Sequence, residues 1–288
     1  MTGTPEPEPE TFLSGETGHV AGVRRTLHRR AGDLALDLRG RPAARGLDEL
    51  AASTPIRRVL ALSVYRPPGE QLERAVVELR RTRHELNLAL GSTGEPAPAL
   101  ANVTVASGLA RGKFENLGAL LEAARSPGFD WLLVVDDDVD LPRRFLDRFL
   151  ALCERFDLAL AQPAQTLMSH AAWTVTRRRG GSLVRETRFV EIGPVTAFRR
   201  DAARALTPFP ALRYGWGLDL HWAAVCAEHG WRLGVVDALP VRHEGLPVAA
   251  GYRAQDAIRE AQRFLADRPF VHAREAQQTL ATHRMLAR

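Results

Sequence analysis

Apolar and polar positions alternate with two different spacings from residue 59 onward, and together they predict strands and helices in turn. Runs dominated by apolar residues predict strands over residues 59–65, 85–90, 103–106 and 131–135. Apolar residues at helical spacing predict helices over residues 72–82 and 116–124. Strand and helix units of about 30 residues, repeated in this order, are typical of a parallel sheet with right-handed crossovers. We therefore expect an α/β fold whose first half is a Rossmann-like, nucleotide-binding layer.

The second half of the chain has a less regular pattern. Helices are predicted over residues 142–156, from near Asp201, and over 220–229, where Gly230 ends the helix. Short strands are predicted over residues 158–161, before a break at Gln162 and Pro163, and over 233–237. Residues 173–178 and 183–190 flank Gly180 and Gly181, which predicts a β-hairpin with a basic tip. This hairpin is expected to be a small addition to the sheet.

These patterns divide the chain into a disordered tail over residues 1–20, a lead-in helical segment over 21–52, a main domain over 53–250 and a helical, arginine-rich extension over 251–288. The tail is assigned from its alternating Pro and Glu. The lead-in segment is expected to break near Gly40 and Pro42. Its alternative interpretation is a partner-binding or membrane-surface element, which leaves peripheral membrane contact open.

The amino-acid composition indicates which class of protein the chain belongs to. A chain of 288 residues with 45% hydrophobic content suits one large α/β domain. No run of eighteen apolar residues occurs and the amino terminus is acidic, so we expect neither a membrane span nor a secretory signal, and a cytoplasmic location. The cysteines Cys153 and Cys226 lack metal-type spacing and are expected in the core. The net charge is +5, but the arginines are spread along the chain, which argues against nucleic acid as the main partner.

A cluster of carboxylates follows the predicted strand 131–135. Asp136, Asp137 and Asp138 crowd the end of this apolar run, where ligands bind in open α/β sheets. Like charges persist together only if a cation or hydrogen-bond donors neutralise them, and hard cations prefer carboxylate oxygens. We therefore expect a divalent metal site. Asp140 is explained separately, as a cap for a helix that has Pro142 in its first turn.

The lone lysine also indicates a functional site. Lys113 is the single lysine among 39 basic residues, which suggests a position where a compact ammonium is required. It follows Gly108 and Gly112, which do not form the Gly-x-Gly-x-x-Gly fingerprint, so dinucleotide-dependent redox chemistry is not expected. A haloacid-dehalogenase-type phosphatase also begins with aspartates at a strand end. The residues that follow Asp138 lack the small and hydroxyl side chains of that class.

Three features separated along the sequence suit one metal-dependent site. The aspartate cluster follows the predicted strand 131–135. Asp219 lies on a Gly/Trp-rich turn before a helix, and His243 lies just after the last predicted strand. Mn²⁺ or Mg²⁺ accepts carboxylates and an imidazole and leaves positions for a diphosphate. An activated phosphate leaving group needs such neutralisation.

The order of these features resembles the GT-A nucleotide-sugar glycosyltransferases, in a family 2-like form. The resemblance rests on a strand ending in Asp-x-Asp, the turn Trp216-Gly217-Leu218-Asp219, and an Asp-x-x-x-x-x-His ending at His243. Further segments resemble a plant-type glycosyltransferase family of undefined substrate: Gln162-Pro163-Ala164, Arg177-Arg178-Arg179, Phe189-Val190-Glu191-Ile192 and Gly234-Val235-Val236-Asp237. The similarity covers residues 59–247 and is more specific over 162–245. It implies a GT-A fold, with a mostly parallel central sheet covered by helices on both faces and a small β-hairpin region on the acceptor side.

The resemblance also implies roles for individual residues. Asp138 would hold the metal that bridges the diphosphate, and His243 would be a further metal ligand. Asp219 matches the catalytic base that takes the proton of an acceptor hydroxyl in inverting members. The nucleotide sugar would be contacted by Tyr65, Arg66, Lys113, Asp136 and Asp137, with Asp136 at the ribose and Lys113 near the phosphates. The acceptor would be contacted by Glu191 and Trp216.

Several alternatives stay open at this level. Gly91, Ser92 and Thr93 occupy the place where many GT-A enzymes carry an acidic residue that reads the base, so the nucleotide is not identified. Trp216 could be a core residue, and pairing of Glu191 with Arg188 is favoured over an acceptor contact. The three arginines at 177–179 are expected to be a solvated tip rather than phosphate ligands. A non-catalytic nucleotide-sugar-binding protein and a nucleotidyltransferase that releases pyrophosphate are the competing functions.

Overall fold

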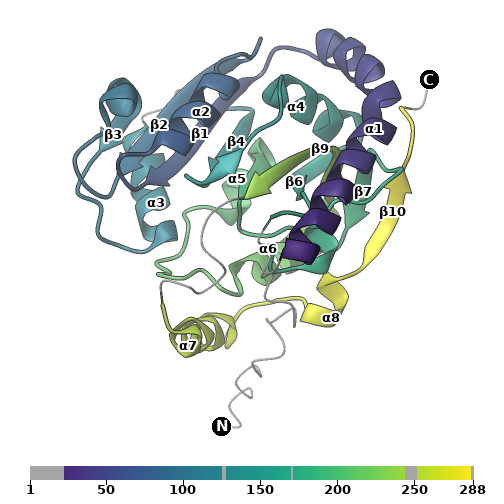
Figure 1. Ribbon diagram of the computed structural model, residues 1–288. Coiled ribbons are helices and arrows are strands. Elements are labelled where there is room, and N and C mark those ends of the chain that lie inside the picture. Colours follow the sequence, from purple (N-terminus) through teal and green to yellow (C-terminus); the bar gives the residue numbers. More distant parts are fainter. Residues whose placement is uncertain (1–22, 125–127, 170, 244–251, 287–288) are drawn as a thin grey trace.

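The computed structural model describes residues 23–124, 128–169, 171–243 and 252–286 (Figure 1). Helices in this part of the chain are α1 (Val23–Ser53), α2 (Glu70–Leu79), α3 (Lys113–Ala123), α4 (Phe145–Arg155), α5 (Arg200–Leu206), α6 (Leu218–Glu228), α7 (Ala254–Leu265) and α8 (Ala273–Ala276). Strands are β1 (Arg58–Tyr65), β2 (Glu85–Ser92), β3 (Thr104–Ala106), β4 (Trp131–Val135), β5 (Val139–Asp140), β6 (Leu158–Gln165), β7 (Val184–Thr187), β8 (Val195–Arg199), β9 (Arg232–His243) and β10 (Thr279–His283).

One mixed sheet forms the centre of the molecule, with the strand order β10-β7-β9-β6-β8-β4-β1-β2-β3. Strands β3, β2, β1 and β4 are parallel to one another, as are β6 and β9. Strand β8 lies between β4 and β6 and is antiparallel to both. This insertion joins the predicted Rossmann-like half to the second half in a single sheet. The predicted α/β class with a mostly parallel central sheet is confirmed.

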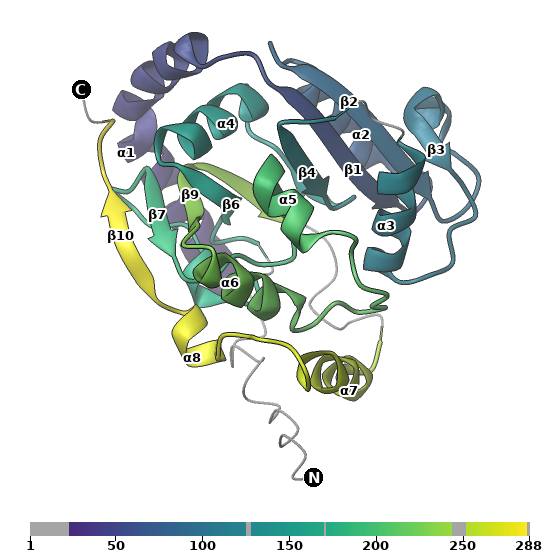
Figure 2. The ribbon, with the colours of Figure 1, turned by 180° about the vertical axis from the view of Figure 1, so that it is seen from behind.

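Helices cover both faces of the sheet because its central strands are apolar on both sides. Leu60, Leu62 and Val134 contribute to a core with α3, α5 and α6. The alternate residues Val59 and Leu133 contribute to a second core with α2 and α4. Figure 1 shows α2 and α4 in front of the sheet, and Figure 2 shows α3, α5 and α6 on the opposite face. Among the residues described, none of the helices is long and apolar enough to cross a bilayer.

Some predicted boundaries of helices and strands are wrong because residues distant in the sequence determine where these elements begin. Asp140 does not cap a helix, because it lies in β5 and pairs with Arg242 of β9. Helix α4 begins later, at Phe145, and the Glu78 carboxylate accepts the N–H groups of Arg144 and Phe145. The prediction of a helix from 142 with an Asp140 cap is therefore wrong.

The predicted hairpin around Gly180 and Gly181 is also wrong. Strand β7 pairs with β9 and β10, and residues 174–176 form a 3₁₀ turn instead of its partner. Strand β6 continues through Gln162 and Pro163, where we expected a break. The carboxy-terminal extension is helical only in part, because β10 adds a strand to the edge of the sheet.

The lead-in segment forms one continuous helix. Helix α1 continues past Gly40 and Pro42, so the predicted break is wrong, and its two ends run in different directions (Figure 1). An interior proline removes one helical hydrogen bond, which commonly bends a helix without ending it. The disordered tail expected over residues 1–20 lies outside the described residues.

A fully buried ion pair holds the second half together. The Arg185 and Asp237 side chains are both 0% exposed, and Nε of Arg185 lies 2.7 Å from a carboxylate oxygen of Asp237. Arg185 also donates to the carbonyls of Val175 and Arg177, and the N–H of Arg179 donates to Asp237. The pair therefore fixes the path of residues 175–179 beside β9.

Removal of one partner should leave an unpaired buried charge. We expect Asp237→Ala to lower the free energy of unfolding by about 3–5 kcal/mol, measured by urea denaturation. The double variant Arg185→Met/Asp237→Leu is the comparison, because it removes both charges and keeps the volume filled. It should be clearly more stable than Asp237→Ala. Equal losses in the two variants would contradict the assignment of this pair.

Candidate active site

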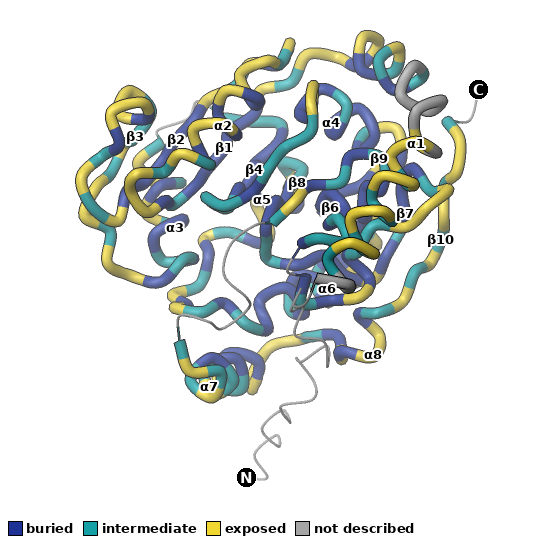
Figure 3. The backbone as a smooth tube through the Cα atoms, viewed as in Figure 1, coloured by how far each residue is buried: buried dark blue, intermediate teal, exposed yellow. Residues whose placement is uncertain are grey.

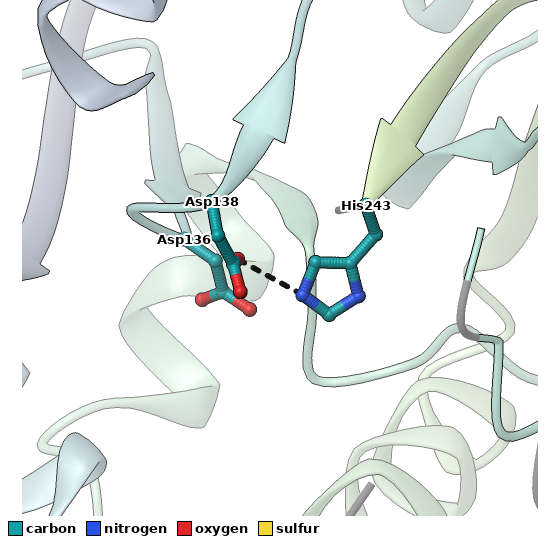
Figure 4. Close-up of side chains that lie close together, drawn as sticks. All are labelled: Asp136, Asp138 and His243. Carbon is teal, nitrogen blue, oxygen red and sulfur yellow. Dashed lines mark ion pairs between the residues drawn. The ribbon is translucent and has the colours of Figure 1, made fainter. Parts of the chain in front are cut away.

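Two segments that are more than a hundred residues apart bring together three side chains of the kinds that bind metal ions. Asp136 and Asp138 follow β4, and His243 ends β9. One ligand atom from each of the three residues lies within 4.8 Å of the others. Nε2 of His243 is 2.9 Å from a carboxylate oxygen of Asp138, and Figure 4 shows the imidazole facing the two aspartates. The expected meeting of Asp138 and His243 is therefore present.

Backbone pairing determines this geometry. Val139 of β5 is directly opposite His243 of β9, so the residue next to Asp138 pairs with the histidine itself. The N–H of His243 donates to Oγ of Ser169 at 3.0 Å. The N–H of Asp136 donates to the carbonyl of Pro194 at 2.8 Å. Both sides of the cluster are thus fixed by the main chain.

Lys113 supplies the cation beside this cluster. Its ammonium lies 2.6 Å from a carboxylate oxygen of Asp136 and donates to the carbonyl of Ile192 at 3.0 Å. Lys113 begins α3, and the preceding Gly112 donates its N–H to the carboxylate of Glu115. A side chain at Gly112 would come within 2.2 Å of the backbone of Arg213. The close approach of this loop explains why glycine precedes the lysine.

Burial and charge shift the pKa values of the cluster in opposite directions. Burial raises the pKa of Asp137, and the charges of Asp138 and Asp136 raise it further, against the hydrogen bond from the N–H of Arg66. Burial also tends to raise the pKa of Asp138, but His243 and Lys113 lower it overall. Burial tends to lower the pKa of His243, yet its hydrogen bond to Asp138 and the nearby acids raise it. The cluster is therefore arranged to hold positive charge.

The donor set fits a divalent cation. Two carboxylates and one imidazole are ligands that Mn²⁺ and Mg²⁺ accept, with coordination positions left for phosphate oxygens. A bound ion would replace the proton shared between Asp138 and His243. Asp136, Asp138 and His243 are the residues that would hold it.

A cavity of about 300 Å³ opens beside the cluster. Its walls include all of the predicted nucleotide-sugar residues: Tyr65, Arg66, Lys113, Asp136 and Asp137. The Tyr65 hydroxyl is occupied by Thr104 and by the N–H of Ala97, which makes it part of the wall. The carboxylate of Asp137 accepts the N–H of Arg66 at 2.9 Å. Arg66 and Lys113 bring positive charge to the cavity beside the carboxylates of Asp136 and Asp137.

Three further polar residues line the cavity and were not predicted as site residues: Thr93, Arg111 and Asn116. Arg111 is exposed and stands two residues before Lys113, so proximity to the lone lysine was a usable signal. Asn116 is buried and donates to the carbonyl of Arg111 at 2.9 Å. Thr93 follows β2, in the place where the acidic base reader was missing. No local pattern distinguishes Asn116 from an ordinary helix residue.

Gly193 is required by the packing around Asp136. A side-chain carbon at this position would lie 2.5 Å from a carboxylate oxygen of Asp136 and 3.2 Å from the ammonium of Lys113. We expect Gly193→Ala to weaken Mn²⁺ binding about 10- to 100-fold, as loss of a supporting contact around a metal typically does. Gly118→Ala is the matched control, because the nearest atom to its added carbon is 4.0 Å away. Calorimetric titration with Mn²⁺ in the presence of GDP or UDP measures both, and equal affinities would contradict this role of Gly193.

A second acidic pair lies behind the cavity wall. Asp219 is 5% exposed and is not among the cavity-lining residues. Burial, followed by the charge of Glu191, raises its pKa to about 8, against hydrogen bonds from the N–H groups of Leu220 and Ile192. Burial likewise raises the pKa of Glu191 to about 7. Because Lys113 binds the carbonyl of Ile192, one residue connects this pair to the cluster. Asp219 lies within the first turn of α6 rather than before it.

Glu191 is held by residues other than the one predicted. Its carboxylate accepts hydrogen bonds from Gln165 at 2.7 Å and from Thr176 at 2.9 Å. Arg188 donates to Gln278 instead, so the favoured Glu191–Arg188 pairing is wrong. These partners could not be predicted from the sequence, because Gln165 and Thr176 belong to segments that are distant from Glu191 along the chain.

The basic tip and the tryptophan also have defined partners. Arg178 is buried against α1 and pairs with Asp37 at 2.6 Å, so the prediction of a solvated tip is wrong for this residue. Trp216 is partly buried, and its indole N–H donates to the hydroxyl of Tyr252 at 3.0 Å. Glu260 of α7 accepts three successive N–H groups, those of residues 213–215. Helix α7 therefore positions the turn that carries Trp216 and Asp219.

No protein-family model matches the chain, and no curated protein matches its sequence. Among solved structures, GalNAc-T7 with UDP, GalNAc and Mn²⁺ matches with a TM-score of 0.52 and 12% identity, over 86% of this chain and 57% of that chain. The mannosyltransferase PcManGT from Pyrobaculum calidifontis, in complex with GDP-Man and Mn²⁺, matches with a TM-score of 0.47 and 17% identity, over 80% and 72%. A mycobacterial protein matches with a TM-score of 0.49 and 16% identity, over 84% and 89%.

The likeness to GalNAc-T7 shows the fold, which is GT-A. This chain covers just over half of the length of that protein. The TM-scores of the other two structures, 0.47 and 0.49, are lower.

Proposed function

We propose that this chain is a metal-dependent glycosyltransferase that transfers a sugar from a nucleotide diphosphate donor to a hydroxyl acceptor. The observation that supports this most is the convergence of Asp136, Asp138 and His243 in the wall of a cavity that Lys113 also lines. On a GT-A fold, this position lies beyond the carboxyl ends of the strands, where such sheets bind ligands. The finer resemblance to a plant-type glycosyltransferase family is part of the same proposal.

The donor would lie in the cavity with its diphosphate beside Asp136 and Asp138. Asp138 and His243 would hold Mn²⁺ or Mg²⁺, and Asp136 would contact the ribose or the ion. The ion would supply charge neutralisation for the diphosphate. Lys113, Arg66 and Arg111 would add positive charge along the cavity wall, which favours a polyanionic ligand. Asp137 would hold the loop at Arg66 through the hydrogen bond described above.

Asp219 is proposed as the base. The acceptor oxygen would attack the anomeric carbon, the bond from that carbon to the phosphate oxygen would break, and the nucleoside diphosphate would leave. The acceptor proton would pass to the carboxylate of Asp219, which inverts the anomeric configuration in a single displacement. A raised pKa suits this role because a stronger base takes a hydroxyl proton more readily.

Glu191 and Trp216 are proposed on the acceptor side. Glu191 is nearly enclosed and its carboxylate already has three donors, those of Gln165, Thr176 and Ala172. Its proposed contribution is therefore to keep negative charge beside Asp219. Trp216 is held by Tyr252, which leaves an aromatic pair suited to a sugar face.

The test is incubation of the full chain with a panel of nucleotide sugars, Mn²⁺ and hydroxyl acceptors. Release of nucleoside diphosphate with formation of a glycoside supports the proposal, and EDTA should abolish it. Release of pyrophosphate would assign a nucleotidyltransferase. Nucleotide binding without turnover on any donor would assign a non-catalytic binding protein.

A further inference from the structure

The outer face of α1 carries three exposed leucines. Leu27 and Leu34 are each 60% exposed, and Leu38 is 49% exposed. Their spacing of seven and four residues places them on one stripe of the helix, which we call the leucine stripe. Figure 3 shows the exposed positions of α1 on the outside of the molecule. The other large apolar residues that are exposed in the described chain are scattered over other elements.

Polar contacts on the opposite face fix the orientation of this helix. The carboxylate of Asp33 accepts the N–H groups of Leu167 and Met168 at 3.0 and 3.2 Å. Arg29 donates to the carbonyl of Leu167 at 3.2 Å. A side chain at Gly32 would lie 2.8 Å from Leu167, so the helix is in close contact there. The leucine stripe cannot be buried by a rotation of α1 without the loss of these bonds.

The sequence of α1 is basic overall. The helix sequence has seven arginines and four acidic residues. Asp33 is bound by backbone N–H groups, Asp37 pairs with Arg178, and Asp48 pairs with Arg144 and Arg148. Three of the four acids are thus compensated by other parts of the protein. Arg30 and His28, beside the leucine stripe, are exposed.

We propose that the leucine stripe docks α1 on the surface of an anionic lipid bilayer. An apolar stripe bordered by basic residues is the pattern of helices that lie in the membrane interface. Anionic headgroups attract nearby arginines, and the acyl region accepts the leucines. A second copy of this chain is a poorer partner, because an antiparallel or parallel pair of α1 helices would bring arginines of both copies together. The proposal does not depend on glycosyl transfer.

The docked helix is coupled to the candidate active site. Leu167 and Met168, which α1 holds through Asp33, are followed by Ser169, and Oγ of Ser169 accepts the N–H of His243. Docking would therefore place the His243 end of β9 one short loop away from the bilayer-bound helix.

Flotation of the full chain with phosphatidylcholine vesicles, with and without phosphatidylglycerol, tests the proposal. The wild type should bind the anionic vesicles, and the triple variant Leu27→Ser/Leu34→Ser/Leu38→Ser should bind at least about tenfold more weakly. Leu280→Ser is the matched control, because Leu280 is 57% exposed on β10, and its binding should equal the wild type. Arg30→Glu should weaken binding to the anionic vesicles only. Circular dichroism and thermal unfolding verify that each variant is folded.

Two kinds of result would overturn the docking proposal, one from vesicle binding and one from the oligomeric state. One is the absence of wild-type binding to anionic vesicles, or equal binding by the triple variant. The other is a wild-type dimer in sedimentation equilibrium that becomes a monomer in the triple variant. That result would assign the leucine stripe to contact between copies of the chain. Neither result bears on turnover of nucleotide sugars, so failure here is distinguishable from failure of the proposed function.

Discussion

Replacement of Asp138 by alanine is expected to reduce metal-dependent sugar transfer by roughly 10³-fold, because it removes a ligand from the centre of the cluster. Asp138 lies 2.9 Å from Nε2 of His243 and is close to Asp136, so no neighbouring carboxylate replaces it without movement of β4 or β9. The variant should also need a much higher Mn²⁺ concentration to reach its remaining activity. Initial rates at saturating donor, measured over a range of Mn²⁺ concentrations, provide the test.

Asp140→Ala is the matched control for this prediction. Asp140 belongs to the same acidic run, but its carboxylate contacts Gln71 and Arg74 and it is outside the metal-type group. Its activity should remain within a fewfold of the wild type. A loss of similar size in both variants would mean that the acidic run acts through folding or through total charge, and not through a metal site at Asp138.

Asp219→Asn is expected to lower the turnover number by about 10² to 10⁴, the contribution of a positioned base, with little change in donor affinity. The asparagine keeps the shape of the side chain and its place at the start of α6. Asp201→Asn is the control, because Asp201 occupies the same position in α5 and pairs with Arg199 at the surface. Unchanged turnover in Asp219→Asn would remove this residue from the mechanism. Equal donor affinity with lost turnover supports its role as base.

The same substitution should stabilise the protein at alkaline pH. A carboxyl group whose folded-state pKa is raised binds more protons when folded than when unfolded, so its burial costs stability as the pH rises from 3.8 through about 8. Asparagine has no such cost. The melting temperature of Asp219→Asn should therefore exceed that of the wild type above neutral pH and approach it in acid. Higher stability with lower activity is the usual relation at a strained functional group.

The pH dependence of transfer follows from the same groups. Asp219 acts as a base only when it is deprotonated, so the rate should rise with pH up to about 8, well above the pH at which an ordinary aspartate ionises. The raised pKa of His243 adds to this trend, because a metal displaces the proton from the imidazole. A rate profile that is flat from pH 5 upward would contradict both assignments.

Local sequence was sufficient where an element and its function lie close together. The apolar run of β4, the aspartates that follow it and the lone Lys113 could each be identified without the structure, and the cavity contains them together. Gly230, in the left-handed region with φ 67°, ends α6 as its position predicts. The α/β class followed from the alternation of strands and helices alone.

Pairing between strands that are distant in the sequence explains most of the differences between the predicted and the observed structure. From the local sequence Asp140 is predicted to be a helix cap, but in the structure it pairs with β9. Strand β7 is predicted to be half of a hairpin, but it pairs with β9 on one side and with β10 on the other. The surroundings of Glu191 depend on Gln165 and Thr176, which no spacing rule connects to it. Helix α1 buries Leu47 and Ala51 near its carboxyl end, whereas Asp33 makes polar contacts with residues 167 and 168, so no single apolar stripe directed inward runs along the helix.

Electron paramagnetic resonance of Mn²⁺ bound to the full chain with saturating GDP or UDP tests the central assignment most directly. The account predicts one bound ion with nitrogen coupling from an imidazole, lost in His243→Ala, and a large fall in affinity in Asp138→Ala. Mn²⁺ binding that is unchanged in both variants, or that shows no nitrogen coupling, would contradict the shared metal site.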